Sequence, residues 1–181
     1  MNADARALPY GIFFGASEVH RELPGFSVSL RTPSLRAEDV PLHTHDNASF
    51  VLVLAGYYLS GADGAPPLCP APTLIFNPAG TTHRDSFKLA SGRFLAISIS
   101  DQSRRVAADG KALPSAAMVM PSKTAVAVAL SLAQQSVSPE LEALPAMEGL
   151  CWEQLLEKHF CAHGVLHDTV KNLRGKALDY K

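Results

Sequence analysis

Three histidines have the residue type and spacing of a ligand set for a metal ion. His43 and His45 are separated by one residue, so on a β-strand both side chains point to the same face. His83 follows Pro78-Ala79-Gly80-Thr81-Thr82, in which proline and glycine favour a tight turn before a returning strand. Imidazoles from two such strands can meet inside a barrel and bind a divalent ion, leaving one side open to water or a ligand.

A second use of the same imidazoles stays open. Histidines can line a polar pocket and hydrogen-bond a small ligand or water, and an ordinary histidine pKa of about 6.5 permits both uses at neutral pH. Strand parity predicts which side chains share a face with the histidines. The predicted site consists of the metal ligands His43, His45 and His83 and the ligand-binding residues Ser49, Val51, Asp85 and Phe87, with Val53 and Phe76 as further apolar walls. No catalytic residue is predicted.

The segment that must position these side chains reads as β-structure. Over residues 1–120, short runs of Val, Leu, Ile and Phe alternate with clusters of Gly, Pro, Asp and Ser, and no helical period intervenes. Many short strands at close spacing are typical of a barrel or sandwich. The strands are expected at Gly11–Phe14, Phe26–Arg31, Ala48–Tyr58, Thr73–Phe76, Arg93–Ser100 and Met118–Met120.

The character of the chain changes after Pro121. A run without glycine or proline, rich in Ala and Leu, predicts a helix from Ser122 to Gln135. Ser138 followed by Pro139 is a typical helix start, which predicts one or two helices between residues 139 and 162, and a shorter helix is expected over Val165–Leu173. Helices that follow the strands, rather than alternate with them, indicate an all-β body with a helical segment over residues 121–181.

The composition, with 47% hydrophobic and 18% charged residues, is that of a globular protein. A formal net charge of −1 supplies no basic face for DNA phosphates, and no apolar run approaches the roughly 20 residues of a membrane-spanning helix. The N-terminus lacks the layout of a secretion signal. Cys69, Cys151 and Cys161 are too few and too scattered for a disulfide framework or a Cys-x-x-Cys metal site. A cytoplasmic protein with buried thiols is therefore expected.

The two histidine segments resemble the paired motifs of the cupin superfamily, Gly-x5-His-x-His-x3,4-Glu-x6-Gly and Gly-x5-Pro-x-Gly-x2-His-x3-Asn. The positions that match are His43, His45 and Gly56 in the first motif and Pro78, Gly80 and His83 in the second. This resemblance implies a mainly β fold, the cupin double-stranded β-helix or jelly-roll barrel. It would occupy residues 1–120 and be followed by two or three C-terminal α-helices.

The first glycine of each motif is absent at its expected place in the sequence, and two further departures matter for the site. Ser49 stands where the family has its glutamate ligand, and Phe87 stands where it has the final asparagine. Without the carboxylate, one divalent metal held by three imidazoles would be Zn, Ni or Cu rather than Fe or Mn. Asp85 could supply a carboxylate behind one of the histidines instead.

One branch of the superfamily resembles this chain more narrowly. Residues 41–58 and 73–87 are similar to the N-terminal sensing domain of AraC-family transcription regulators, in which the glutamate position is commonly not acidic. The resemblance implies a domain that binds a small-molecule effector or a metal in the barrel and forms a homodimer through its C-terminal helices. Contact with DNA would need a further domain, because residues 121–181 are too few for two helix-turn-helix units of roughly 100 residues.

The alternative function is a small metal-dependent cupin enzyme, a dioxygenase or an isomerase, with a three-histidine site. The metal would then act as a Lewis acid or oxygen activator. Against this function, the glutamate is missing and no acid–base pair stands near the motifs. No nucleophile elbow, phosphate loop or nucleotide fingerprint occurs in the sequence either.

Overall fold

The computed structural model describes residues 5–88, 91–108 and 113–156, and within them the chain is mainly β. Its helices are α1 (Asp101–Ala107), α2 (Lys123–Ser136) and α3 (Ala143–Leu155), with a 3-10 turn at Ala37–Asp39. The strands are β1 (Arg6–Leu8), β2 (Ala16–Leu23), β3 (Phe26–Thr32), β4 (His43–His45), β5 (Ser49–Ala55), β6 (Tyr57–Leu59), β7 (Leu68–Pro70), β8 (Thr73–Asn77), β9 (Thr82–His83), β10 (Ser86–Phe87), β11 (Arg93–Ile99) and β12 (Met118–Val119). No helix among these residues is both long and apolar enough to cross a membrane.

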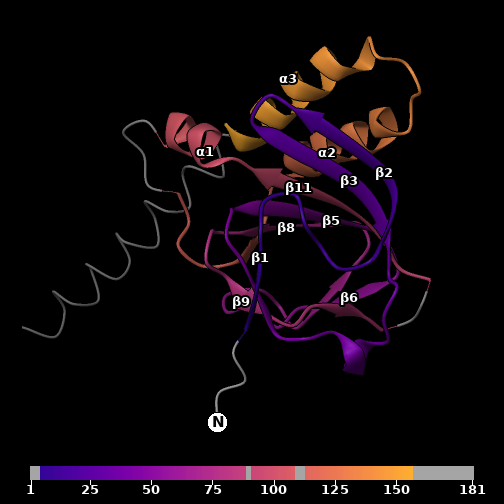
Figure 1. Cartoon of the computed structure of the whole chain (residues 1–181), viewed down its shortest axis with the longest axis vertical. Helices are drawn as coiled ribbons and strands as arrows, with labels where there is room; N and C mark the ends of the chain where they lie inside the picture. The colour runs from indigo at the N-terminus through magenta and orange to yellow at the C-terminus, as the bar shows by residue number, and fades with distance from the viewer. Residues whose placement is uncertain (1–4, 89–90, 109–112, 157–181) are drawn as a thin grey trace, which may run out of the picture.

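The strands form a jelly-roll barrel with one large and two small sheets. The large sheet has six antiparallel strands in the order β12-β8-β5-β11-β3-β2. The small sheets have the orders β1-β4-β9 and β10-β6-β7, and β6 and β9 lie on the side of the barrel away from α2 and α3 (Figure 1). Strands that are distant in sequence lie side by side, as β3 and β11 do, because the chain crosses between the sheets as it does in a jelly roll.

The large sheet is covered on both faces, because alternate residues of each strand enter different cores. Phe50 and Leu52 of β5 face outward and pack with Leu132 of α2 and Met147 of α3 in the helix-facing core. Val51 and Val53 face inward and join the barrel-interior core, together with side chains from the small sheets. This two-sided burial explains why β5 reads as a continuous apolar run rather than an alternating one.

The sequence-based boundaries are confirmed to within one residue for β3, β8, β11 and β12. The single strand predicted at Ala48–Tyr58 is instead divided at Gly56 into β5 and β6, and the strand predicted at the N-terminus is wrong. Residues 11–14 form a turn and an irregular segment instead of the predicted strand. Gly11 and Gly15 take φ values of 75° and 107°, which an extended strand does not accommodate. The strand β2 begins only after them, and its mostly exposed, polar residues gave no apolar signal for it.

The helices also differ in part from the expectation. The helix predicted from Ser122 is confirmed as α2, and the Ser122 hydroxyl accepts a hydrogen bond from the Ala125 amide at its N-terminus. The helix α1 was not expected, since residues 1–120 were read as entirely β-structure; the Ser100 side chain caps it. The predicted start at Ser138 is wrong, because α3 begins only at Ala143. The helix predicted over Val165–Leu173 and the thiol of Cys161 lie outside the described residues.

The buried thiol of Cys151 on α3 provides a test of how tightly that helix is packed. Burial, with a smaller contribution from the charge of Glu148, raises the pKa of this thiol to about 12. At pH 8 the reactive thiolate is then on the order of one part in ten thousand. Native protein treated with iodoacetamide should leave Cys151 unmodified by peptide mass spectrometry, whereas unfolded protein should be modified fully. Rapid alkylation in the native state would contradict the position of α3.

Candidate metal centre

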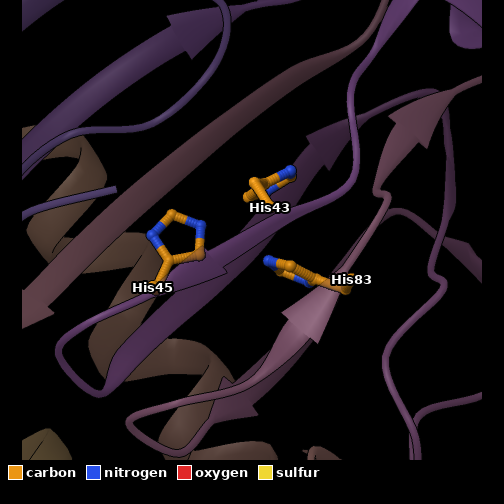
Figure 2. A group of neighbouring side chains, drawn as sticks. All are labelled: His43, His45 and His83. Atoms are coloured by element: carbon orange, nitrogen blue, oxygen red, sulfur yellow. The ribbon is translucent and has the colours of Figure 1, made fainter. Parts of the chain in front are cut away.

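The predicted histidine triad is brought together by the pairing of β4 with β9. β4 lies between β1 and β9, and His43 is the direct cross-strand partner of His83. His43 and His45 point to the same side of β4, as their spacing predicts. One nitrogen from each ring lies within 4.8 Å of the others, and all three side chains are buried. Figure 2 shows the three rings turned toward one another, with His83 reaching across from its neighbouring strand.

The turn before β9 fixes the position of His83. Gly80 has a φ of 81°, the left-handed conformation that the sequence predicted for this turn. Its amide donates a hydrogen bond of 2.9 Å to the carbonyl oxygen of His45. The Thr81 amide donates to the Pro78 carbonyl oxygen and closes the turn. The backbone of one ligand segment is thereby bonded directly to the backbone of the other.

The tautomer of His43 is set by the backbone. Its Nδ1 lies 2.9 Å from the carbonyl oxygen of Pro41, which can only accept a hydrogen bond. The proton therefore resides on Nδ1, and Nε2 keeps its lone pair for a metal. Burial, the largest influence, lowers the pKa of this imidazole and keeps it neutral.

His45 has an apolar environment. Its ring lies against that of Phe13, with centroids 4.7 Å apart. Burial, followed by the neighbouring His83 and His43, lowers its pKa to about 3. The imidazole is consequently neutral across the physiological range, which is the form that binds metals.

Asp85 contacts the third histidine of the triad, His83. One of its oxygens, Oδ2, lies 2.6 Å from Nδ1 of His83 and accepts a hydrogen bond of 2.5 Å from the hydroxyl of Tyr58. The other, Oδ1, accepts from the Ser60 hydroxyl at 3.2 Å and from the Gly61 amide at 2.8 Å. Burial alone would raise the pKa of Asp85, but the contacts with His83, Tyr58 and Gly61 outweigh it and lower the pKa.

This arrangement leaves a buried nitrogen facing the centre of the triad. Among the described residues, Nε2 of His83 has no hydrogen-bond partner. A buried polar atom without a partner is costly and usually indicates a bound ion, water or ligand. A carboxylate behind a histidine orients the ring and makes it a better ligand, an arrangement common at zinc sites. The donor set thus fits a divalent metal.

A pocket opens beside the histidines. Its inner cavity has a volume of about 60 Å³ and is lined by all three histidines, by Asp85 and by several aromatic rings. A wider outer cavity of about 410 Å³ shares Pro33, Ser34, Leu35 and Phe87 with it. The site is therefore a narrow, mostly apolar chamber with imidazoles at one end.

The predicted ligand-binding residues are placed unequally. Val51, Asp85 and Phe87 line the inner cavity. Ser49 is buried in β5 in register with Asn77 and Ser98, and it is not among the lining residues, so this position does not support its predicted contact with a ligand. The wall predicted at Phe76 is wrong, because that ring faces outward into the helix-facing core.

Several residues of the site were missed by the sequence analysis. Phe13, Phe14, Val40 and Phe94 also line the pocket. Phe13 and Phe14 lie in the irregular segment before β2, where strand parity gives no orientation. Tyr58 could have been found, because a tyrosine on a strand beside a predicted carboxylate is a frequent hydrogen-bond donor.

Comparison with known proteins finds weak structural similarity and no match in sequence. No protein-family model matches the chain. No curated protein sequence matches it either. A cupin-2 domain protein from Shewanella frigidimarina is 15% identical, with a TM-score of 0.39, over 49% of this chain and 83% of its own. An RmlC-like cupin family protein from Methanocaldococcus jannaschii is 9% identical, with a TM-score of 0.38, over 59% of this chain and 92% of its own.

A putative mannose-6-phosphate isomerase from Ralstonia eutropha is 17% identical, with a TM-score of 0.38, over 55% of this chain and 94% of its own. Overlaps of this extent carry no argument about activity. The strand pairing described above establishes the fold class on its own. The chain is a mainly β jelly-roll barrel followed by C-terminal α-helices, the fold that its cupin-like motifs predict.

Proposed function

We propose that this chain is a sensing domain of the AraC type, in which His43, His45 and His83 hold one divalent metal and the adjoining pocket binds a small effector. The observation that supports this proposal is the set of three buried, converging imidazoles at the end of an apolar chamber. A metal bound there would supply a Lewis-acidic coordination position for one donor atom of the effector.

The ligand set favours Zn, Ni or Cu over Fe or Mn. All three ligands are imidazoles, and the position of the cupin glutamate is taken by Ser49. Asp85 does not replace that carboxylate as a ligand, because both of its oxygens already accept hydrogen bonds or contact His83. It serves behind His83, in the role of a partner that orients a metal-binding histidine.

The environment of Asp85 also favours sensing over catalysis. In the alternative, a metal-dependent dioxygenase or isomerase, this residue would transfer protons. A general base needs a free oxygen within reach of its substrate and a pKa near the working pH. Asp85 has its oxygens occupied and a lowered pKa, so it is a poor base.

In the proposal, ligand binding in the pocket is communicated to the helices through β5. β5 contributes Val51 to the pocket with its inward face and Phe50 to the helix-facing core with its outward face. A ligand that binds one arrangement of the helices more tightly than another would shift their population. In the proposal these helices form a homodimer contact, and DNA is bound only through a domain outside this chain.

Metal uptake and hydrogen exchange test this function together. Purified protein incubated with excess Zn²⁺ and then dialysed should retain about one equivalent by mass spectrometry of the metal. Zinc binding should also alter hydrogen–deuterium exchange in α2 and α3, as well as in β4 and β9. Protein that retains no Zn²⁺, Ni²⁺ or Cu²⁺ would contradict the metal site. A change confined to β4 and β9 would contradict a coupling of the metal site to the helices and leave the metal site itself intact.

A further inference from the structure

The pocket beside the histidines offers very few polar partners to a bound molecule. Apart from the histidines, the polar side chains among its described lining residues are Ser34, Tyr58, Asp85 and Ser86. The hydroxyl of Tyr58 is already donated to Asp85, whose oxygens are all engaged. Ser34 is exposed and Ser86 half-buried, which places both at the rim. In the depth of the chamber, the imidazole nitrogens of the triad are the polar groups left for a ligand or its metal.

The remaining walls are aromatic and aliphatic. Phe87 stacks on Phe94 with ring centroids 5.5 Å apart, and Tyr58 meets Phe87 edge to face at 5.2 Å. The other apolar lining residues are Phe13, Phe14, Val40 and Val51. A hydroxyl of a ligand buried against these walls would give up its hydrogen bonds to water without replacement, which is unfavourable.

The size of the inner cavity restricts the ligand further. Its volume of about 60 Å³ is well below the roughly 150 Å³ of an apolar cavity that accommodates benzene. Only the metal-binding group and a short apolar chain fit beside the histidines. The wider outer cavity shares Phe87 and Leu35 but is also lined by Arg36, Glu38 and Lys88, so the restriction to apolar groups applies to the part of the ligand that enters the inner cavity.

From these features we infer that the effector is a small apolar molecule with a single metal-binding group, such as a short aliphatic acid, and that sugars and other polyhydroxylated compounds are excluded. This inference rests on the proposed metal-dependent sensing function. The walls of the pocket would then discriminate between ligands, because a site without partners for hydroxyl groups rejects the molecules that carry them.

Butyrate and 3-hydroxybutyrate form a matched pair of probes, because they share the carboxylate and the chain length and differ by one hydroxyl. Co²⁺-loaded protein should change its visible absorption spectrum as either acid reaches the metal. Butyrate is expected to bind at least about tenfold more tightly. Any chelation of the metal by the hydroxyl would favour 3-hydroxybutyrate, so such chelation cannot produce the expected result.

A variant tests whether the wall causes this preference. Val51 lines the pocket and is buried, and threonine differs from valine by a hydroxyl in place of one methyl group. Val51→Thr would add one hydroxyl to the wall and should narrow the preference for butyrate several-fold. Equal or tighter binding of 3-hydroxybutyrate by the unmodified protein would overturn the inference, and so would a preference that Val51→Thr leaves unchanged.

The metal proposal and the ligand inference can fail separately. Protein that takes up no Co²⁺ contradicts the metal site. The two acids would then be compared on metal-free protein by ligand-observed saturation-transfer NMR. A stronger signal from butyrate would support an apolar site without a metal. Equal signals, or none from either acid, would overturn the ligand class as well.

Discussion

A His83→Ala protein is expected to bind Zn²⁺ more than about 100-fold more weakly than the unmodified protein, since removing a ligand should exceed the 10- to 100-fold effect of removing its supporting partner. His83 is the ligand that β9 contributes, and its loss leaves two imidazoles from a single strand. Competition with a chromophoric chelator at neutral pH measures the affinity. The matched control is His20→Ala, because His20 lies on β2 outside the triad and its ring contacts the side chain of Glu22.

A second variant with a smaller expected effect tests the role of Asp85. Asp85→Asn keeps the size of the side chain but removes the charge beside Nδ1 of His83, so a loss of about 10- to 100-fold in affinity is expected. The order of affinities should be unmodified protein and His20→Ala first, then Asp85→Asn, then His83→Ala. Equal affinity in His83→Ala and the unmodified protein would place the metal elsewhere. Equal affinity in Asp85→Asn would show that the carboxylate only supports the fold.

Leu132→Ala should lower the free energy of unfolding by about 2–5 kcal/mol. Leu132 lies on α2 and is fully buried in the helix-facing core, where truncation to alanine leaves a cavity between helix and sheet. Leu130 lies on the same helix with 41% of its surface exposed, so Leu130→Ala should change stability by no more than about 0.5 kcal/mol. Urea unfolding followed by circular dichroism measures both variants.

The difference between the stability losses of Leu132→Ala and Leu130→Ala tests how α2 packs. Similar small losses in both variants would mean that α2 is not packed on the sheet as described. Similar large losses would mean that the exposed side of α2 is covered in solution. A second copy of the chain, as in the proposed homodimer, would cover it in that way, and dependence of the unfolding midpoint on protein concentration would identify it.

The sequence allowed the central barrel and the histidine triad to be predicted because both depend on local rules. The spacing of His43 and His45 determines that they share a face of β4, and Pro78 with Gly80 determines the turn that returns the chain to His83. The start of α2 was predicted at Ser122, and the structure shows that the hydroxyl of this residue caps the helix. Each of these features is decided within a few residues of the chain.

The errors concern residues whose orientation depends on distant partners. Phe76 faces the helices rather than the pocket because α2 covers the outer face of the large sheet, which the sequence of β8 alone does not reveal. Phe13 reaches the histidines through an irregular segment that follows Gly11. β2 carries mostly polar, exposed residues, pairs with β3 and adds only Val19 and Leu23 to the helix-facing core. Tertiary packing, rather than local propensity, decides these positions.

Because the large sheet is buried on both faces, substitutions along β5 should fall into two classes. Residues 49–53 are all buried, so this stretch has no position at which a polar substitution would meet solvent. Inward positions such as Val51 should alter what the pocket accepts, and outward positions such as Leu52 should alter how firmly the helices dock. A saturation scan of this strand would therefore show two interleaved phenotypes with a period of two, one in ligand preference and one in abundance.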